Sequence, residues 1–340
     1  MVTMENKKVL LNHGSGGRLT HQLIDSIFGS RFSNPVLDQR TDSAVIDVSG
    51  QKVAFTTDSF VVNPIFFPGG NIGKLAVCGT VNDLAVSGAT PQALSVSFII
   101  EEGFSFDELE KIAESMALTA KEAGVSIVTG DTKVVNRGMA DKIFINTSGI
   151  GPIRQERAGI GPGEKVKEGD VVIVNGFIGD HGMAILAARE ELPFSADVKS
   201  DCAPLNHLIA DILDTTDQVT FMRDATRGGL GTVICELAES RNAGILIEEK
   251  ALPVRNAVKS MSDMFGFDPL FIANEGKVVL TVREKDSERV LGAMRKNPLG
   301  TDAAVIGRVT ADKGIVEMKT MIGGRRIISM PAGDQLPRIC

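Results

Sequence analysis

Val81-Asn-Asp-Leu-Ala-Val-Ser-Gly-Ala89 places one acidic side chain inside a small, apolar run of this 340-residue chain. It ends a segment, residues 71–88, whose small and apolar side chains predict a closely packed helix. Strand-like runs lie on both sides of it, at 53–57 and 93–100. A charge inside an apolar helix is costly unless it is paired or binds a metal. Asp83 is therefore the first candidate site residue.

On both sides of this segment, strand and helix signals alternate along most of the chain. A capping box, Ser105-Phe-Asp-Glu108, and Gly124 delimit one amphipathic helix, and the cluster 159–163 is typical of a linker. The other predicted elements are strands at 125–129, 142–150, 170–175, 219–222, 244–247 and 278–282, and helices at 182–191, 204–214 and after Gly228. We therefore expect two α/β (α+β) domains, 1–155 and 156–330, followed by a tail, 331–340.

Composition excludes several classes of function. The net charge of -7 and the absence of Trp and Tyr argue against nucleic-acid binding. The first residues lack the apolar run of a signal peptide, and no stretch approaches the ~18 apolar residues of a membrane span. The four cysteines are far apart in sequence and form no C-x-x-C pair. This spacing argues against a structural zinc site or a disulfide framework, and favours the reducing cytoplasm.

Five aspartates share similar settings, in or beside apolar segments. A single aspartate of this kind is more often a helix cap or a turn residue, but several together suggest Mg²⁺, which prefers oxygen ligands and normally brings a phosphate with it. Two glycine clusters, His13-Gly-Ser-Gly-Gly17 and Arg227-Gly-Gly229, could hold phosphate, although neither is a P-loop or a dinucleotide fingerprint. The residues thus predict an unconventional Mg-nucleotide site. The aspartates are Asp42, Asp58, Asp83, Asp131 and Asp224.

The chain ends in a cysteine, Cys340, on the tail that begins at Pro331. We expect its thiol to be solvent-exposed and mobile, because Gly333 provides one flexible point and Pro337 one stiff point. A thiolate is a strong nucleophile, so this position suits a carrier of an acyl or carbamoyl group. The alternatives are a terminal residue without a role and a stray disulfide partner.

Several motifs together resemble the superfamily of aminoimidazole ribonucleotide synthetase and selenophosphate synthetase. They are Thr56-Thr-Asp-Ser59, Val81 to Ala89, Gly130-Asp-Thr-Lys133, Asp224-Ala-Thr-Arg-Gly-Gly229 and Asn274-Glu-Gly276. The opening glycine cluster and the terminal Pro337-Arg-Ile-Cys340 narrow this resemblance to the HypE family of carbamoyl dehydratases, which serve [NiFe]-hydrogenase maturation. The resemblance implies a two-domain fold, ATP bound between the domains, and a homodimer in which the N-terminal domains form a shared β-barrel.

The resemblance also implies an activity and partners. A carbamoyltransferase, HypF, would load Cys340 with a carbamoyl group, and ATP would drive dehydration of that group to a thiocyanate. The cyanide would then pass to iron on the HypC–HypD complex.

The resemblance assigns roles to residues of this chain. Glu275 is the candidate base, with a solvated loop carboxylate as the alternative. Lys133 would either stabilise charge on the transferring phosphoryl group or polarise the carbonyl. His13 would lie over the phosphates, whereas His21, His181 and His207 are expected at the surface or at helix caps. Mg²⁺ would bind Asp42, Asp58, Asp83 and Asp224, and the nucleotide would contact Gly14, Gly16, Gly17, Asp131, Thr132, Arg227, Gly228 and Asn274.

Two rival functions are weaker. A selenophosphate synthetase-like enzyme needs a reactive Cys or selenocysteine near its N-terminus, but no cysteine precedes Cys78, which lies in the predicted apolar helix. A non-enzymatic carrier that only presents Cys340 would not need the aspartates.

Overall fold

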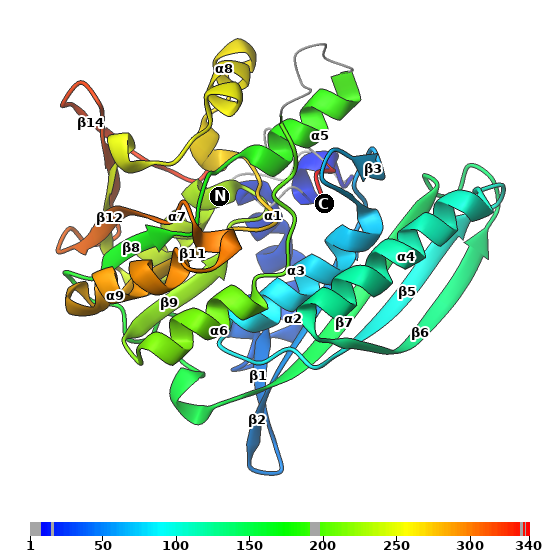
Figure 1. Cartoon of the computed structure of the whole chain (residues 1–340), viewed down its shortest axis with the longest axis horizontal. Coiled ribbons are helices and arrows are strands. Elements are labelled where there is room, and N and C mark those ends of the chain that lie inside the picture. Colours follow the sequence, from blue (N-terminus) through cyan, green and yellow to red (C-terminus); the bar gives the residue numbers. More distant parts are fainter. Residues whose placement is uncertain (1–7, 15–16, 191–197, 334–335, 337) are drawn as a thin grey trace.

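Two β-sheets with their helices make up the protein (Figure 1). The computed structural model describes residues 8–14, 17–190, 198–333, 336 and 338–340. In the described part of the chain, no helix has the length and apolar character needed to cross a bilayer.

The first sheet has five strands in the order β1-β2-β7-β5-β6, all antiparallel except the parallel pair β5–β6. Helices α3 and α4 cover one of its faces (Figure 1). The bounds are β1 Ala44–Val48, β2 Gln51–Phe60, α3 Ile72–Val86, β5 Ala93–Glu101, α4 Phe106–Ala123, β6 Ser126–Val135 and β7 Ile143–Ile153. A small hairpin, β3 Phe66–Phe67 and β4 Gly70–Asn71, precedes α3.

Helix α3 is the buried centre of this domain because its sequence permits close contacts. The Asn71 side chain caps it by accepting hydrogen bonds from the backbone amides of Gly73 and Lys74. At Gly73 an added Cβ would lie 2.5 Å from the carbonyl oxygen of Ile112, so only glycine lets α3 approach α4 this closely. Almost every side chain of α3 is buried, which is why its sequence is apolar on all sides.

The second sheet has seven strands in the order β14-β13-β10-β12-β8-β11-β9. Its strands are β8 Val171–Val174, β9 Val219–Asp224, β10 Gly244–Glu248, β11 Val278–Val282, β12 Ala304–Thr310, β13 Val316–Lys319 and β14 Arg325–Ile327. Its helices are α5 Asp180–Glu190, α6 Asn206–Thr215, α7 Gly229–Arg241, α8 Asn256–Phe265 and α9 Glu284–Met294. The short N-terminal helices are α1 Arg18–Leu23 and α2 Ser30–Phe32.

The two halves meet along α3, which contacts both α6 and β9. The Asn82 side chain on α3 donates to the carbonyl of Ala203 at 3.1 Å and accepts from the amide of Leu205 at 2.7 Å. The helix that carries Asp83 is therefore attached directly to the second half of the chain.

Several sequence predictions need correction. Ser105 is the N-cap of α4, but its side chain makes no capping hydrogen bond, so the predicted capping box is absent; the stop at Gly124 is confirmed by a φ of +70°. Asp58 and Asp131 lie inside β2 and β6 rather than after strands, because both strands run several residues further than predicted. The boundary between domains near residue 155 stays a prediction.

Candidate active site

Cys340 lies inside the protein rather than at its surface. Its side chain is only 7% exposed, and Ile339 beside it is 2% exposed. The amide of Val61, just after β2, donates to the terminal carbonyl of Cys340 at 3.1 Å, and the amide of Asn63 donates to that of Arg338 at 3.3 Å. The expectation of a solvent-exposed thiol is therefore wrong for this docked tail. Pro337 lies outside the described residues.

Arg227 contacts both ends of the chain at this point. Its Nε donates to Cys340 Sγ at 2.8 Å, and one terminal nitrogen donates to the carbonyl of Gly14 at 2.7 Å. Gly17 lies against the tail, because a Cβ there would be 3.0 Å from the Cα of Gly333. The N-terminal glycine cluster and the C-terminal thiol, predicted separately, thus meet at one guanidinium group.

The other residues of these two clusters have local roles. His13 ends the turn before Gly14, where its Nδ1 accepts from the amide of Leu10 at 2.9 Å. Gly228 has a φ of +72°, and a Cβ there would lie 2.2 Å from the hydroxyl of Thr232, so the start of α7 requires glycine. Gly16 lies outside the described residues.

The four predicted metal ligands come from different elements but lie within electrostatic range of one another. Asp83 lies on α3, where one carboxylate oxygen is 2.7 Å from the hydroxyl of Thr56. Asp42 lies just before β1 and pairs with Arg223 at 3.0 Å. The Asp58 carboxylate packs against α3 at Gly79, where an added Cβ would lie 3.4 Å from its oxygen and only 2.9 Å from the Phe60 ring.

Burial raises the pKa values of these four carboxyl groups. Burial raises the pKa of Asp42 to about 6, against the opposing effect of Arg223. Burial, and next the neighbouring aspartates, raise the pKa values of Asp83 and Asp224 well above the usual range. Burial also raises the pKa of Asp58, opposed by Arg227. Asp224 is buried and the other three aspartates are partly buried, so the cluster is a sparsely solvated set of oxygen ligands with too little positive charge around it.

Glu275 is also buried, at 2% exposure, and one of its carboxylate oxygens has no hydrogen-bond partner in the described structure. Burial raises its pKa well above the usual range, and nearby acidic groups raise it further. The alternative of a solvated loop carboxylate is therefore wrong. Burial likewise raises the pKa of the Cys340 thiol to about 12, although Arg227 acts in the opposite direction. The docked sulfur is a neutral thiol at neutral pH.

Asp131 and Lys133 are not brought to this cluster. They pair with each other at 2.7 Å on β6, where both side chains are more than half exposed. Ser97 and Ile99 of β5 are their partners in register, and this row of side chains faces away from α3, whereas Asp58 faces toward it. Thr132, between them, points to the opposite face from its two neighbours.

Asn274 makes structural hydrogen bonds within the site. Its side-chain oxygen accepts from the amide of Gly179 at 2.7 Å, and its nitrogen donates to the carbonyls of Ala225 and Ile272. These bonds fix the backbone on either side of the site; contact with a nucleotide stays a prediction. Among the described residues, no three Asp, Glu, His or Cys side chains converge as a metal site in this arrangement.

Comparison with known proteins shows the family to which this chain belongs. Residues 40–153 match the family "AIR synthase related protein, N-terminal domain", and residues 167–319 match the corresponding C-terminal domain. The chain is 48% identical to "Carbamoyl dehydratase HypE" of Rhodobacter capsulatus, over 100% of both chains. It is also 48% identical to the protein of that name from Escherichia coli K12, over 98% of this chain and 99% of the relative. The chain belongs to the HypE family.

Solved HypE structures share this fold. A HypE in complex with ATP superposes with a TM-score of 0.82 at 46% identity, covering 98% of this chain and 100% of that one. The structure of a HypE–HypF complex gives a TM-score of 0.86 at 47% identity, covering 91% and 99% of the two chains.

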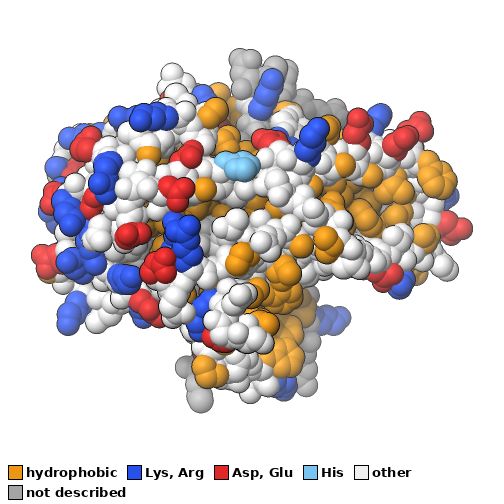
Figure 2. All heavy atoms as spheres, turned by 60° about the horizontal axis from the view of Figure 1, so that its bottom comes forward, with side chains coloured by type: hydrophobic (Ala, Val, Ile, Leu, Met, Phe, Trp, Pro, Cys, Tyr) orange, Lys and Arg blue, Asp and Glu red, His pale blue; other side chains and the backbone are white. Residues whose placement is uncertain are grey.

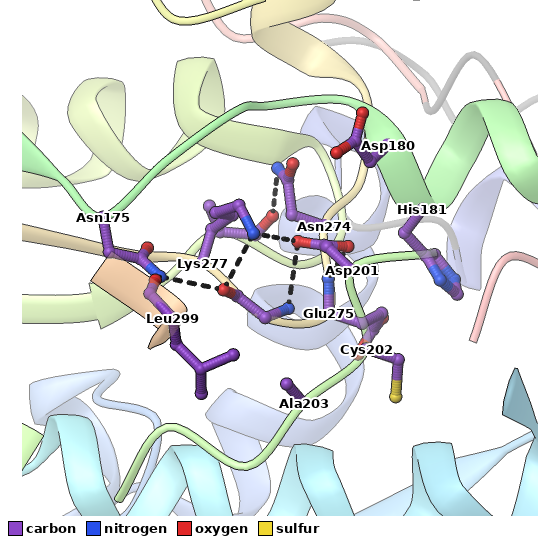
Figure 3. Close-up of polar contacts among 12 residues, drawn as sticks. Asn175, Asp180, His181, Asp201, Cys202, Ala203, Asn274, Glu275, Lys277 and Leu299 are labelled. Carbon is purple, nitrogen blue, oxygen red and sulfur yellow. Dashed lines mark hydrogen bonds and ion pairs between the residues drawn. The ribbon is translucent and has the colours of Figure 1, made fainter. Parts of the chain in front are cut away.

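This HypE-family chain carries three further site residues that sequence analysis did not single out. His181 is fully buried, so the expected surface or capping role is wrong. Asp201 and Lys277 form a buried ion pair at 2.9 Å beside Glu275 (Figure 3). In the sequence, Asp201 and Lys277 are marked only by their charge, a feature that many surface residues share.

Proposed function

We propose that this protein is an ATP-dependent carbamoyl dehydratase, which converts an S-carboxamide on its own Cys340 into a thiocyanate that supplies cyanide for the iron of [NiFe]-hydrogenase. The observation that carries the proposal is the docked Cys340 sulfur, which accepts a hydrogen bond from Arg227 and lies within electrostatic range of Glu275 and Asp58. A carrier that only presented its thiol would have no reason to bury it among acidic groups.

The reaction converts the S-carboxamide and ATP into the thiocyanate, ADP, phosphate and one proton. The carbonyl oxygen attacks the γ-phosphorus, and the C–O bond then breaks so that this oxygen leaves as phosphate. The two N–H protons leave as the C≡N bond forms. Arg227, already a donor to the sulfur, would stabilise negative charge on the oxygen. Glu275 would accept a proton, because a buried carboxylate with a raised pKa is a stronger base than a solvated one.

The nucleotide would bind beside the aspartates with Mg²⁺ held by Asp42, Asp58, Asp83 and Asp224. A relative of this chain binds ATP, as the name of its solved complex states. The ion, when bound, neutralises the triphosphate charge. The donor set fits it, since all four side chains offer oxygen and Arg223 and Arg227 compensate their mutual repulsion only in part. Asp42 would have to weaken its pair with Arg223 to join the other three.

Replacing Asp83 by Asn should change ligand binding and stability in opposite directions. The variant should lose at least tenfold in Mg-ATP affinity, or ~1.4 kcal/mol, measured by calorimetry. Without ligand, it should melt at a higher temperature than the wild type, since one of several buried, mutually repelling carboxyls is gone. Asp217→Asn, at an exposed position, is the matched control. Unchanged affinity in Asp83→Asn would contradict the metal assignment.

Loading requires the tail to leave this position. A carbamoyltransferase cannot reach a sulfur that is 7% exposed, and the neutral thiol is a poor nucleophile. We propose HypF as this donor, because a relative forms a solved complex with it. We propose the HypC–HypD complex as the acceptor of the cyanide. The chemistry needs Cys340 as a free thiol, which fits a reducing cytoplasm.

We also propose a homodimer formed through the uncovered face of the first sheet. Figure 2 shows hydrophobic side chains gathered on this side of the molecule. Exposed apolar residues on the face opposite α3 include Ile46, Val48, Phe55, Ile99 and Ile150. Asp131 and Lys133 share that face, so any contact of theirs with a nucleotide would be with the nucleotide of the partner subunit. The shared β-barrel would follow from two such faces meeting.

Light scattering at micromolar concentration should therefore give twice the 36.1 kDa of one chain. Phe55→Lys places a charge against its register neighbour Ile150 and should give monomers. Phe106→Lys, at an exposed position on α4, should leave the dimer intact. A wild-type protein of 36.1 kDa in solution would refute the dimer.

The function itself is tested by intact mass after incubation with a carbamoyl donor, the carbamoyltransferase and ATP. The protein should first gain a carbamoyl group and then lose the mass of one water, with ADP formed in equal amount. A selenophosphate synthetase-like enzyme would hydrolyse ATP without this mass change, and a simple carrier would stop at the carbamoyl adduct.

A further inference from the structure

The last three residues are held by several groups, and one of these groups, His181, is a fully buried side chain. His181 Nε2 lies 2.8 Å from the carbonyl oxygen of Ile339, and His181 is fully buried on the first turn of α5. Arg338, in contrast, forms a part-exposed ion pair with Asp141 at 2.7 Å. A buried hydrogen bond in a place without water contributes more to position than an ion pair at the surface.

The partners of His181 fix its protonation. A carbonyl oxygen can only accept, so Nε2 carries the proton and donates to Ile339. Nδ1 then accepts from the hydroxyl of Ser200 at 2.7 Å, and Ser200 accepts in turn from the amide of Cys202 at 3.1 Å. Burial lowers the pKa of His181, which agrees with a neutral ring. An edge-on contact with Phe67, at 5.5 Å between ring centres, keeps the ring in place.

The segment that holds His181 also holds the candidate base. Asp201 accepts from the amide of Glu275 at 3.0 Å and from that of Gly276 at 3.2 Å (Figure 3). The approach is close enough that a Cβ at Gly276 would lie 2.0 Å from the Asp201 carbonyl oxygen. Lys277 compensates the Asp201 charge. Residues 200–203 therefore connect His181, which binds the tail, to the backbone of Glu275.

We propose that His181 is a positioning residue for the reaction at Cys340. It holds the Ile339 carbonyl by a hydrogen bond and connects it, through residues 200–203, to the loop that carries Glu275. The carboxamide on Cys340 and its proton acceptor are then placed by one continuous set of hydrogen bonds, so the base is in position when the tail is docked. This inference rests on the proposed function for its catalytic consequence, but the seating of the tail can be measured without any reaction.

The test is the rate at which N-ethylmaleimide labels Cys340 in the full-length protein, without ATP or carbamoyl donor, followed by peptide mass spectrometry. His181→Phe keeps an apolar ring against Phe67 but loses both hydrogen bonds, and should raise the labelling rate of Cys340 by about tenfold. His181→Gln can place an amide N–H near the position of Nε2, and should restore most of the protection. Labelling of Cys235, on α7, is the internal reference and should not change.

Turnover gives the second measurement. In His181→Phe, kcat for thiocyanate formation should fall about tenfold while the KM for ATP stays constant. His207→Phe, at a histidine that bonds the carbonyl of Glu122 instead, should match the wild type in both assays. If His181→Phe does not fold, Ser200→Ala removes the partner of Nδ1 and should give a smaller rise in labelling.

Equal Cys340 labelling in the wild type and in a folded His181→Phe or Ser200→Ala protein would overturn the proposal. Failure of the wild type to form thiocyanate would refute the proposed function instead, and would leave the labelling result valid.

Discussion

Cys340→Ser should form no thiocyanate at all and should still bind Mg-ATP with the affinity of the wild type. Serine keeps an oxygen that can accept the Arg227 hydrogen bond, so the docked tail is preserved. Its hydroxyl is a far weaker nucleophile than a cysteine thiol, so the carbamoyltransferase should not load it. Intact mass after incubation with carbamoyl donor, carbamoyltransferase and ATP should show neither the carbamoyl nor the cyano form.

Cys235→Ser is the matched control and should react normally, since Cys235 lies on α7 with its thiol directed to the carbonyl of Ile328. Truncation after Pro337 removes the thiol together with Ile339, a buried apolar residue, so that variant should also lose some stability. A cyano group on another residue of the Cys340→Ser protein would refute both the carrier role and the mechanism built on it.

Sequence reasoning succeeded where one local pattern had one structural solution. The small, apolar run before Ser87 could only be a buried helix, and α3 confirms it. The role of Asp83 within that run as a metal ligand stays a prediction. A φ of +72° explains why Gly228 is glycine, while its contact with a nucleotide stays a prediction.

Strand register could not be predicted in the same way. Asp131 was grouped with Asp58 because each follows a predicted strand, but its side chain lies on the other face of the sheet. A register shift between Leu94 and Ser95, where β5 pairs with β6, sets which side chains of β6 face α3, and no feature of the sequence reveals that shift. One residue of difference in pairing moves a side chain to the opposite face of a sheet.

Sequence reasoning failed for the tail. Its length and its glycine suggested a free segment, but Leu336 and Ile339 are both buried. Two apolar side chains in a short terminal segment were a signal of docking that the proline and arginine between them obscured. The burial of His181 followed from that docking and could not be seen without it.

Glu275→Gln should lower kcat for thiocyanate formation by about 10²–10⁴-fold, the usual contribution of a general base. ATP affinity and carbamoyl loading should not change, because Gln has nearly the shape and volume of Glu and leaves the other groups of the site in place. The carbamoyl adduct should therefore accumulate in intact-mass measurements made over the time of the reaction. Glu239→Gln, at an exposed position on α7, is the control.

The same variant should change how stability depends on pH, and this checks the environment of Glu275 independently of catalysis. A carboxyl whose pKa is raised on folding stabilises the folded state fully below its ordinary pKa of 4.5, and this contribution is lost as the pH rises above that value. Gln does not titrate. The melting temperature of Glu275→Gln should thus rise relative to that of the wild type between pH 5 and pH 8. Normal turnover of Glu275→Gln would remove Glu275 from the mechanism. A difference in melting temperature between the variant and the wild type that stays constant with pH would show that the Glu275 carboxyl is not buried in the folded protein.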